Sequence, residues 1–407
     1  MFDQVSPSLQ YGKFSVENMD KSVPVLILGG RENSLSLARS LGRLGITVRI
    51  SGPNDCWGMN SKYCHQRFSI PANTGHAEYW SNLLLSDRNT HLHGSLLIAG
   101  SDTAIEFIAA NFDSLSRHFR LGHQNPELQL HLLDKRKTLD LAHKAKIPAP
   151  TYWNVENEAD LARLLEQVTF PVMVKPIHSH KFIPVVGRKL FIIKNDADDL
   201  VRKIRLCWEK ELEIMVVEMI PGPDSALSSF YTYIDDHTVS HFEYTKKVIR
   251  RYPQNRGLAC YHSSEWMPET AAAGKAFFNK IGFTGFGNIE FKRDPRDNKL
   301  KVIEANSRFT AAQELIIRSG APIDLIFYCV ATGQMAPTFS TYQQDLTYWY
   351  GLRDTLAFLE LRRKGELTIR QWLSSLSPHK QISPLHDLDD IYPTLGAIRA
   401  RIAKTFG

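Results

Sequence analysis

The stretch FGNIEFKRDPRDNKLKVIEANSRF, residues 286–309, carries the pattern that decides the predicted fold. Two runs of alternating apolar and polar residues flank DPRDN, a cluster of residues that favour turns. The pattern therefore predicts a β-hairpin. With a loop over residues 295–299, Asp294 lies opposite Leu300 on the partner strand. The other residue pairs of the hairpin follow from that register.

Side chains alternate between the two faces of a strand, so each face of this hairpin has its own character. On one face Glu290 lies opposite Glu304, and Asn288 lies opposite Asn306. Lys292 shares this polar face. The expected apolar face consists of Ile289, Phe291, Ile303 and Ala305.

The facing carboxylates of Glu290 and Glu304 need an explanation, because like charges directly across a ladder destabilise the pair. A cation between them would remove the repulsion. Carboxylate and amide oxygens suit Mg²⁺ or Mn²⁺, and Mg²⁺ commonly completes its coordination with phosphate oxygens. The hairpin therefore indicates a magnesium–nucleotide site. The alternative is a solvated polar face in a different register, which needs no ligand.

Length and composition limit the classes of protein to consider. A chain of 407 residues exceeds what one hydrophobic core normally serves, so two or three domains are expected. The net charge of +6 suits a small anionic substrate but is too diffuse to indicate a nucleic-acid partner. The five scattered cysteines show no metal-binding spacing and are typical of reduced thiols. We recognise no signal peptide and no membrane span, so we expect a cytoplasmic protein.

The first part of the chain predicts an α/β domain. Residues 1–22 are expected to form a flexible leader. The apolar run VPVLIL, the helical spacing after it and the run ITVRI predict a β–α–β unit in a mostly parallel sheet. We assign residues 23–130 to this domain. Its GGRENS turn lacks the G-x-G-x-x-G pattern, which argues against NAD or FAD there.

Later segments carry candidate nucleotide-binding groups. Lys175 closes the apolar strand FPVMVKP, where its charge is costly unless it meets an anion; the alternative is a lysine that extends to solvent. The basic loop 178–191 could cover phosphates. Glu218 lies near the end of the strand IMVVEMI and could accept a hydrogen bond from an exocyclic amine. The last backbone groups of that strand could read the edge of a purine.

A cation-rich stretch and a helical end complete the chain. Five cations between residues 246 and 256 form either a solvated face or an anion site, and the constraint of Tyr252-Pro253 favours the anion site. The leucine and aromatic spacing predicts helices over residues 350–363 and 368–376, packed on the preceding domain.

Together these segments resemble the ATP-grasp superfamily over nearly the whole chain. The specific features are Lys135 at an Asp-Lys helix start, Lys175 on a later strand, the segment VVEMIPGPD, and the IEF and VIEANSR motifs of the hairpin. The segments LGRLGITVRIS, IPGPDSALSSF and RRYP are similar to those of predicted ATP-grasp carboligases. That family includes D-aspartate ligase-like carboxylate–amine ligases.

The resemblance implies an ATP-grasp fold of the α/β and α+β classes. A Rossmann-like N-terminal domain would precede two α+β subdomains that grip ATP. The small subdomain would span residues 131–215, and the large subdomain, with the magnesium site, residues 216–340. A helical extension would occupy residues 341–407.

The resemblance also implies roles for individual residues. Those implied to bind ATP are Lys135 and Lys175 at the phosphates, Glu218, Met219 and Ile220 at adenine, and Asp224 at the ribose. Those implied to hold one or two Mg²⁺ are Glu290, Glu304 and Asn306. Arg308 would stabilise charge on the transferred phosphoryl group or acyl phosphate, and Arg250 would help to bind phosphate or the substrate carboxylate. Three features depart from the family pattern: Ser307 stands where relatives often have a proline, Asn288 stands where some related ligases carry an arginine, and loop 178–191 lacks phosphate-covering glycines.

The implied activity is ATP-dependent ligation of small molecules. The enzyme would phosphorylate a carboxylate to an acyl phosphate, which an amine attacks to give an amide, ADP and phosphate. One rival is a bicarbonate-activating carboxylase, although the sequence has no Met-Lys-Met biotin attachment motif. The other is an ATP-binding regulator without turnover, which would not need the second carboxylate. Many relatives pair, so a homodimer is an open alternative.

Overall fold

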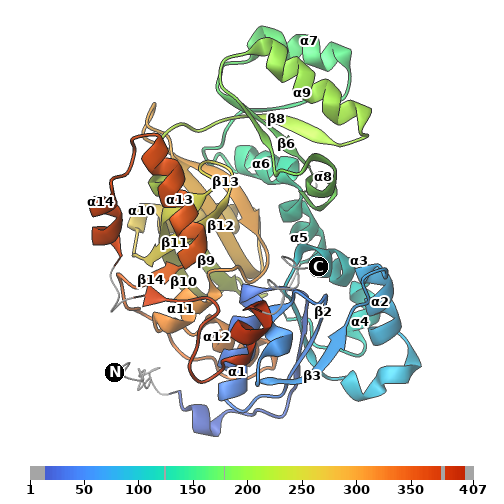
Figure 1. The fold of residues 1–407 in the computed structure, drawn as a ribbon. Coiled ribbons are helices and arrows are strands. Elements are labelled where there is room, and N and C mark those ends of the chain that lie inside the picture. The colour runs from blue at the N-terminus through green and yellow to red at the C-terminus, as the bar shows by residue number, and fades with distance from the viewer. Residues whose placement is uncertain (1–13, 123–124, 178, 377–380, 399–407) are drawn as a thin grey trace.

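The structure is a computed structural model that describes residues 14–122, 125–177, 179–376 and 381–398. Three sheets organise these residues into three neighbouring bodies (Figure 1). Parts of the expected leader, phosphate-covering loop and C-terminal extension lie outside the described residues, namely 1–13, 178, 377–380 and 399–407. No helix in the described ranges is long and apolar enough to cross a membrane.

The N-terminal domain, blue in Figure 1, is built on a parallel sheet of order β3-β2-β1-β4. Alternate residues of β1 enter two different hydrophobic cores, Val25 and Ile27 on one face and Leu26 and Leu28 on the other. Both faces are therefore covered, as the continuous apolar run predicts. The strands are β1 (Val25–Leu28), β2 (Val48–Gly52), β3 (Cys64–Ser69) and β4 (Leu96–Ala99). The helices are α1 (Glu32–Arg43), α2 (His76–Leu84), α3 (Asp102–Ala110) and α4 (Phe112–Ser116).

The small subdomain, green in Figure 1, has an antiparallel sheet of order β5-β8-β6-β7. Its strands are β5 (Tyr152–Asn154), β6 (Val172–Pro176), β7 (Phe191–Ile193) and β8 (Ile214–Glu218). Its helices are α7 (Glu158–Gln167), α8 (Ser179–Val186) and α9 (Ala197–Glu209), and the preceding helices are α5 (Pro126–Leu133) and α6 (Lys135–Lys144). Helix α8 occupies part of the stretch that was expected to be a loop. Phe182 stabilises it, because this side chain is buried with its ring 6.0 Å from that of Phe191.

The large subdomain contains a seven-stranded sheet of order β13-β12-β9-β10-β11-β14-β15. Its strands are β9 (Leu227–Ile234), β10 (Ser240–Tyr252), β11 (Leu258–Ser264), β12 (Gly285–Arg293), β13 (Leu300–Asn306), β14 (Thr347–Trp349) and β15 (Gln381–Ile382). Its helices are α10 (Pro268–Lys280), α11 (Gln313–Arg318), α12 (Ile323–Ala331), α13 (Gly351–Arg363) and α14 (Ile369–Ser375). The C-terminal part, expected to be helical, thus also adds two strands. Tyr348 helps to stabilise β14, because its ring is fully buried in a small core with Leu315 and Leu346.

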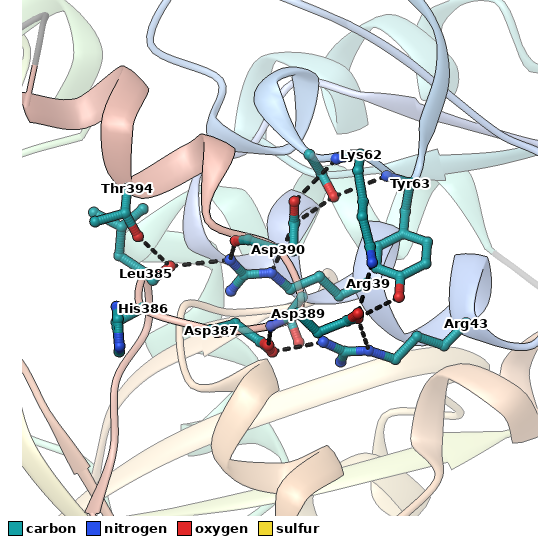
Figure 2. A network of polar contacts seen from close by, with 12 residues as sticks. Arg39, Arg43, Lys62, Tyr63, Leu385, His386, Asp387, Asp389, Asp390 and Thr394 are labelled. Carbon is teal, nitrogen blue, oxygen red and sulfur yellow. Dashed lines mark hydrogen bonds and ion pairs between the residues drawn. The ribbon is translucent and has the colours of Figure 1, made fainter.

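A buried ion pair fastens the end of the chain to the N-terminal domain (Figure 2). Arg39 donates from Nε to Asp390 Oδ2 over 3.0 Å and from Nη2 to the Leu385 carbonyl over 3.0 Å. The side chains of Arg39 and Asp390 are only 1% and 0% exposed. The same carboxylate accepts bonds from Ser61 Oγ at 2.6 Å and from the Lys62 backbone N–H at 3.0 Å. The buried charges therefore balance each other, and the carboxylate has further donors.

More exposed contacts surround this pair. Arg43 binds Asp387 at 2.6 Å and Asp389 at 3.2 Å, and Lys62 binds Asp389 at 2.6 Å. The Tyr63 hydroxyl also donates to Asp389 (Figure 2). Residues 385–390 therefore bind helix α1 and the 61–63 segment. They add polar contacts to the hydrophobic core that the N-terminal domain shares with the large subdomain.

We predict that Asp390→Asn destabilises the protein much more than Asp389→Asn. Loss of the buried carboxylate charge leaves the Arg39 guanidinium without a counter-charge, which costs roughly 3–5 kcal/mol, whereas partly exposed pairs contribute about 1 kcal/mol or less. Urea unfolding of both variants, followed by tryptophan fluorescence, measures the difference. Equal losses of stability would show that the buried pair does not fasten the chain end.

Candidate functional site

The hairpin of β12 and β13 places four polar side chains as the sequence predicts. Asn288 pairs with Asn306, and Glu290 pairs with Glu304. Strand β9 continues the same row on the other side of β12, where Ser229 pairs with Glu290. The two carboxylates therefore lie side by side on one face of the sheet.

The predicted register is wrong nearer the turn. Arg293, rather than Asp294, pairs with Leu300, because a bulge makes Ile303 an extra residue in β13. Val302 consequently takes the place expected for Ile303 on the apolar face, and it is fully buried in the core there. The bulge lies on the turn side of Glu290 and leaves the polar pairs unchanged.

The two carboxylates have different surroundings. Burial raises the pKa of Glu290 above its ordinary value; the nearby Lys246 ammonium opposes that change, and the charge of Glu304 adds to it. Glu304 is exposed, whereas Glu290 is half-buried. A half-buried carboxylate that repels its neighbour is a position where a bound cation would lower the free energy of the ionised form.

Glu290, Glu304 and Asn306 offer too few ligands to hold a metal by themselves. They suit Mg²⁺, which commonly binds few protein ligands together with phosphate oxygens. Within the described ranges, no group of three or more His, Cys, Asp or Glu side chains could hold a metal. Asn306 adds an amide to the two carboxylates. Its Nδ2 donates to Asn288 Oδ1 over 3.2 Å, so the amide oxygen is the atom that would bind a cation. Two carboxylates and an amide oxygen leave room for phosphate oxygens, the arrangement that Mg²⁺ favours.

The structure brings the two predicted phosphate-binding lysines toward this hairpin. Lys175 lies near the end of β6, and Lys135 is the first residue of α6 after its capping residue Asp134. Burial lowers the pKa of Lys175 to about 8, the charge of Glu304 opposes this change, and that of Lys135 adds to it. Glu304 and Lys135 are therefore close enough for their charges to change the pKa of Lys175.

The segment after β8, expected to bind adenine, is fixed by its backbone. The Met219 N–H donates to the Pro171 carbonyl over 3.1 Å. Lys292 Nζ donates to the carbonyls of Ile220 and Gly222 at 3.0 and 2.8 Å. The sequence indicated no definite role for Lys292. The structure makes it the buried anchor of this segment, a role that depends on carbonyl groups with no sequence signal of their own.

Acidic residues of the same segment contact basic side chains of the large subdomain. Glu218 accepts bonds from Arg296, which lies in the hairpin turn, and from the Thr151 N–H at 3.1 Å. Asp224 is buried and accepts a bond from Arg251 Nε at 2.7 Å. Contacts of Glu218 with adenine and of Asp224 with ribose would therefore share these carboxylates with arginines.

The two arginines singled out from the sequence lie in different environments. Arg308, just after β13, donates from Nε to Asp102 Oδ1 over 2.5 Å, and so links the hairpin to the N-terminal domain. Arg250 makes a two-pronged ion pair with Asp354 of α13, at 2.6 and 3.0 Å, and donates to Ser375 Oγ at 2.8 Å. Only 5% of Arg250 is exposed. This arrangement differs from the expected phosphate or substrate contact and makes Arg250 an anchor for the C-terminal helices.

Two basic side chains, Lys246 and His262, lie buried against each other near the carboxylates, and the sequence did not predict this contact. Lys246 Nζ lies 3.2 Å from His262 Nδ1, and both side chains are at least nine-tenths buried. Burial lowers the pKa of Lys246 and of His262, and the lysine charge depresses the pKa of His262 further. The cation-rich stretch contained this lysine, but its pairing with a histidine on the next strand could only come from the tertiary structure.

Comparisons with known proteins give a consistent picture. No model of a known protein family matches the chain. It is 28% identical over 288 residues to D-aspartate ligase from Enterococcus faecium (strain Aus0004), a match that covers 67% of each chain. It is 25% identical over 186 residues to D-alanine–D-alanine ligase from Pseudomonas fluorescens (strain Pf0-1), which covers 43% of this chain and 53% of that relative.

A solved structure agrees with the expected fold. The biotin carboxylase domain of 2-oxoglutarate carboxylase from Hydrogenobacter thermophilus, in complex with MgADP, ADP and bicarbonate, matches with a TM-score of 0.58. The match covers 78% of this chain and 71% of that one at 17% identity, so it concerns the fold alone. The predicted ATP-grasp fold is confirmed. The chain thus has this fold and is similar in sequence to two ATP-dependent ligases, as the resemblance to ATP-grasp enzymes predicts.

Proposed function

We propose that this protein is an ATP-dependent carboxylate–amine ligase that activates an amino-acid carboxylate as an acyl phosphate. The observation that carries the proposal is the facing pair of Glu290 and Glu304 beside two lysines from other elements. A protein that only binds a nucleotide needs no second carboxylate here. The names of the two relatives described above, D-aspartate ligase and D-alanine–D-alanine ligase, favour an amino acid as the substrate that is activated.

One group of the site residues would bind the nucleoside part of ATP, and another would bind its phosphates and magnesium. Met219 and Ile220 would offer backbone groups to adenine, with Glu218 beside them, and Asp224 would face the ribose. Lys135 and Lys175 would bind the phosphates. Glu290, Glu304 and Asn306 would hold magnesium, which when bound supplies positive charge to the phosphate oxygens.

Arg308 would stabilise the charge on the acyl phosphate. Phosphoryl transfer needs mainly positioning and electrostatic stabilisation, and a guanidinium provides both in a fixed planar geometry. Its Nε already donates to Asp102, so one edge of the guanidinium has a fixed direction. Nη1 also donates to the Phe309 carbonyl over 3.4 Å, and the N–H groups of Nη2 would face the transferred group.

A screen of D- and L-amino acids tests the proposal. The purified full chain with MgATP should release ADP when the correct acid and amine are present, and hydroxylamine should trap the acyl phosphate as a hydroxamate. Bicarbonate belongs in the same screen, because the structural relative was solved with this anion. Stimulation by bicarbonate alone would favour a carboxylase, and no stimulation by any pair would favour a non-catalytic binder.

We predict that Glu304→Gln abolishes substrate-dependent ADP release while the fold stays intact. The change removes one of the two charges that hold the cation, and Glu304 is exposed, so its loss costs little stability. Glu243→Gln is the matched control, because Glu243 lies on β10 of the same sheet and pairs with Lys275 of α10 at 2.6 Å. Full turnover by the Glu304 variant would contradict the metal assignment.

We also predict that ATP binding weakens as the pH rises through about 8, the pKa to which burial lowers Lys175. Only the charged ammonium attracts phosphate, so binding above this pH requires proton uptake, and affinity falls by up to about tenfold per pH unit. Calorimetric titration with ATP between pH 7 and 9 measures the slope. The Lys175→Met variant should bind more weakly at pH 7 and show a flatter profile; an unchanged slope would assign the effect to another group.

A further inference from the structure

A row of polar side chains continues from the predicted metal site across the large sheet. Glu304 pairs with Glu290, and Glu290 pairs with Ser229 of β9. Ser229 in turn pairs with Lys246 of β10, so all four side chains share one face of the sheet. Because neighbouring strands lie about 4.8 Å apart, the backbone of Lys246 is roughly 10 Å from that of Glu290. The row therefore extends beyond the position of a cation held by the two carboxylates.

The same face continues over β11 and β14. Ser264 pairs with Lys246, and His262 lies two residues before Ser264, so His262 and Lys246 share this face. His262 pairs with Tyr348 of β14, and their ring centroids lie 5.8 Å apart in an edge-on arrangement. Two basic side chains thus lie between the metal carboxylates and the C-terminal part of the chain.

The ammonium group of Lys246 is buried without an acidic partner. Its side chain is 2% exposed, and it forms no ion pair with any residue that the structure describes. Glu290 is close enough to favour the charged form of the lysine, but the two do not form an ion pair. Nζ donates to His262 Nδ1 over 3.2 Å, which uses one of its three N–H groups. A buried ammonium with N–H groups to spare costs free energy unless an anion binds there.

Buried hydroxyl groups near the lysine also lack hydrogen-bond partners in the described part of the chain. They are the Oγ atom of Ser229 and the Oη atoms of Tyr348 and Tyr350. Each has a polar neighbour, Tyr231 for Ser229, Glu32 for Tyr350 and the other tyrosine for Tyr348, but none of these contacts has hydrogen-bond geometry. Buried polar groups in native proteins are almost always paired, so these hydroxyls indicate a polar ligand or water on this face.

A second cation reaches this face from the C-terminal part of the chain. Arg353 of α13 forms no ion pair within the described ranges, and its guanidinium lies over the Tyr350 ring, 4.5 Å from the ring centroid. Burial is the main cause that lowers the pKa of His262, and the charges of Lys246 and Arg353 lower it further. Two cations without acidic partners therefore lie near a cluster of unpaired hydroxyl groups.

We propose that Lys246 and Arg353, with the hydroxyl groups of Ser229 and Tyr348, bind a substrate carboxylate that the reaction leaves unchanged. This inference rests on the proposed ligase function. A carboxylate supplies the missing negative charge and accepts hydrogen bonds from ammonium, guanidinium and hydroxyl donors. His262 is a positioning residue, because its Nδ1 fixes the direction of one N–H group of Lys246.

The carboxylate bound at Lys246 differs from the one that is activated. The activated carboxylate must meet the transferred phosphoryl group beside Glu290 and Glu304, and it becomes part of the acyl phosphate. Lys246 lies two strands away from Glu290 in the sheet. One substrate therefore carries a further carboxylate, either on the acid, as in an amino dicarboxylic acid, or on an amine that is itself an amino acid. The chemistry of recognition is the same for both.

The test measures how strongly the full-length protein prefers substrates that carry the free carboxylate. With hydroxylamine as the trapping amine, aspartate and glutamate are compared with alanine and 2-aminobutyrate as acids, each in both enantiomers. With an acid that forms hydroxamate, glycine is compared with methylamine as the amine. The readout is the ratio of kcat/KM within each pair, because a change in ATP or magnesium binding affects both members equally and cancels in the ratio.

For the wild type we expect at least one ratio of about 10- to 100-fold in favour of the free carboxylate, as for a charged hydrogen bond. Lys246→Met should bring that ratio close to one, and Lys246→Arg should restore part of it. Arg353→Met, at a half-buried position, should lower the same ratio. Lys247→Met is the matched control and should keep the wild-type ratio, because Lys247 lies on the opposite face of β10 and pairs with Glu265 at 3.8 Å.

Two results would overturn the inference. If the wild type shows no preference within any pair, the polar row holds only water. If Lys246→Met lowers activity but keeps the ratio, the lysine serves only to offset the charge of Glu290. A preference in the acid pairs identifies the acid as the source of the carboxylate, and a preference in the amine pair identifies the amine. Failure of the proposed function is distinct, because the wild type would then form no hydroxamate from any acid.

Discussion

Two carboxylates placed directly across a β-ladder are the constraint around which the site is built. Glu290 and Glu304 repel each other, and half-burial of Glu290 adds to the cost. Other parts of the chain bring positive charge toward them: Lys175 from the small subdomain, and Lys246 from β10. These cations offset part of the repulsion, and magnesium with phosphates would offset more of it.

The site depends on contacts between domains that are far apart in sequence. Lys292 anchors the segment after β8, which we assign to adenine binding, through two backbone carbonyls. Arg308 connects the hairpin to Asp102 of the N-terminal domain. The Arg39–Asp390 pair holds helix α1 of the N-terminal domain to the C-terminal part of the described chain. These polar contacts add to an apolar one, because the N-terminal domain and the large subdomain share a hydrophobic core that includes Ile27 and Phe286. The small subdomain has a core of its own.

Local patterns predicted more of the site than long-range contacts did. Alternation along each strand was enough to put Glu290 and Glu304 on the polar face of the hairpin, because the side-chain period of a strand is two. Their direct pairing also depended on the assumed turn, and it is correct because the bulge offsets the one-residue error in that turn. The bulge at Ile303 broke that period near the turn, and the adjacent apolar residues Val302 and Ile303 were its only trace in the sequence. The ion pair of Arg250 was not predicted for another reason: its partner, Asp354, lies about a hundred residues later on a helix whose docking the sequence does not specify.

The acyl phosphate is the central claim, and transfer of oxygen tests it most directly. An amino acid that supports turnover, labelled with ¹⁸O in its carboxylate, is incubated with the protein, MgATP and the amine, and the released phosphate is examined by mass spectrometry. Our account predicts one labelled oxygen in the inorganic phosphate, because the carboxylate oxygen leaves with the phosphoryl group. Unlabelled phosphate, or label in AMP, would contradict it.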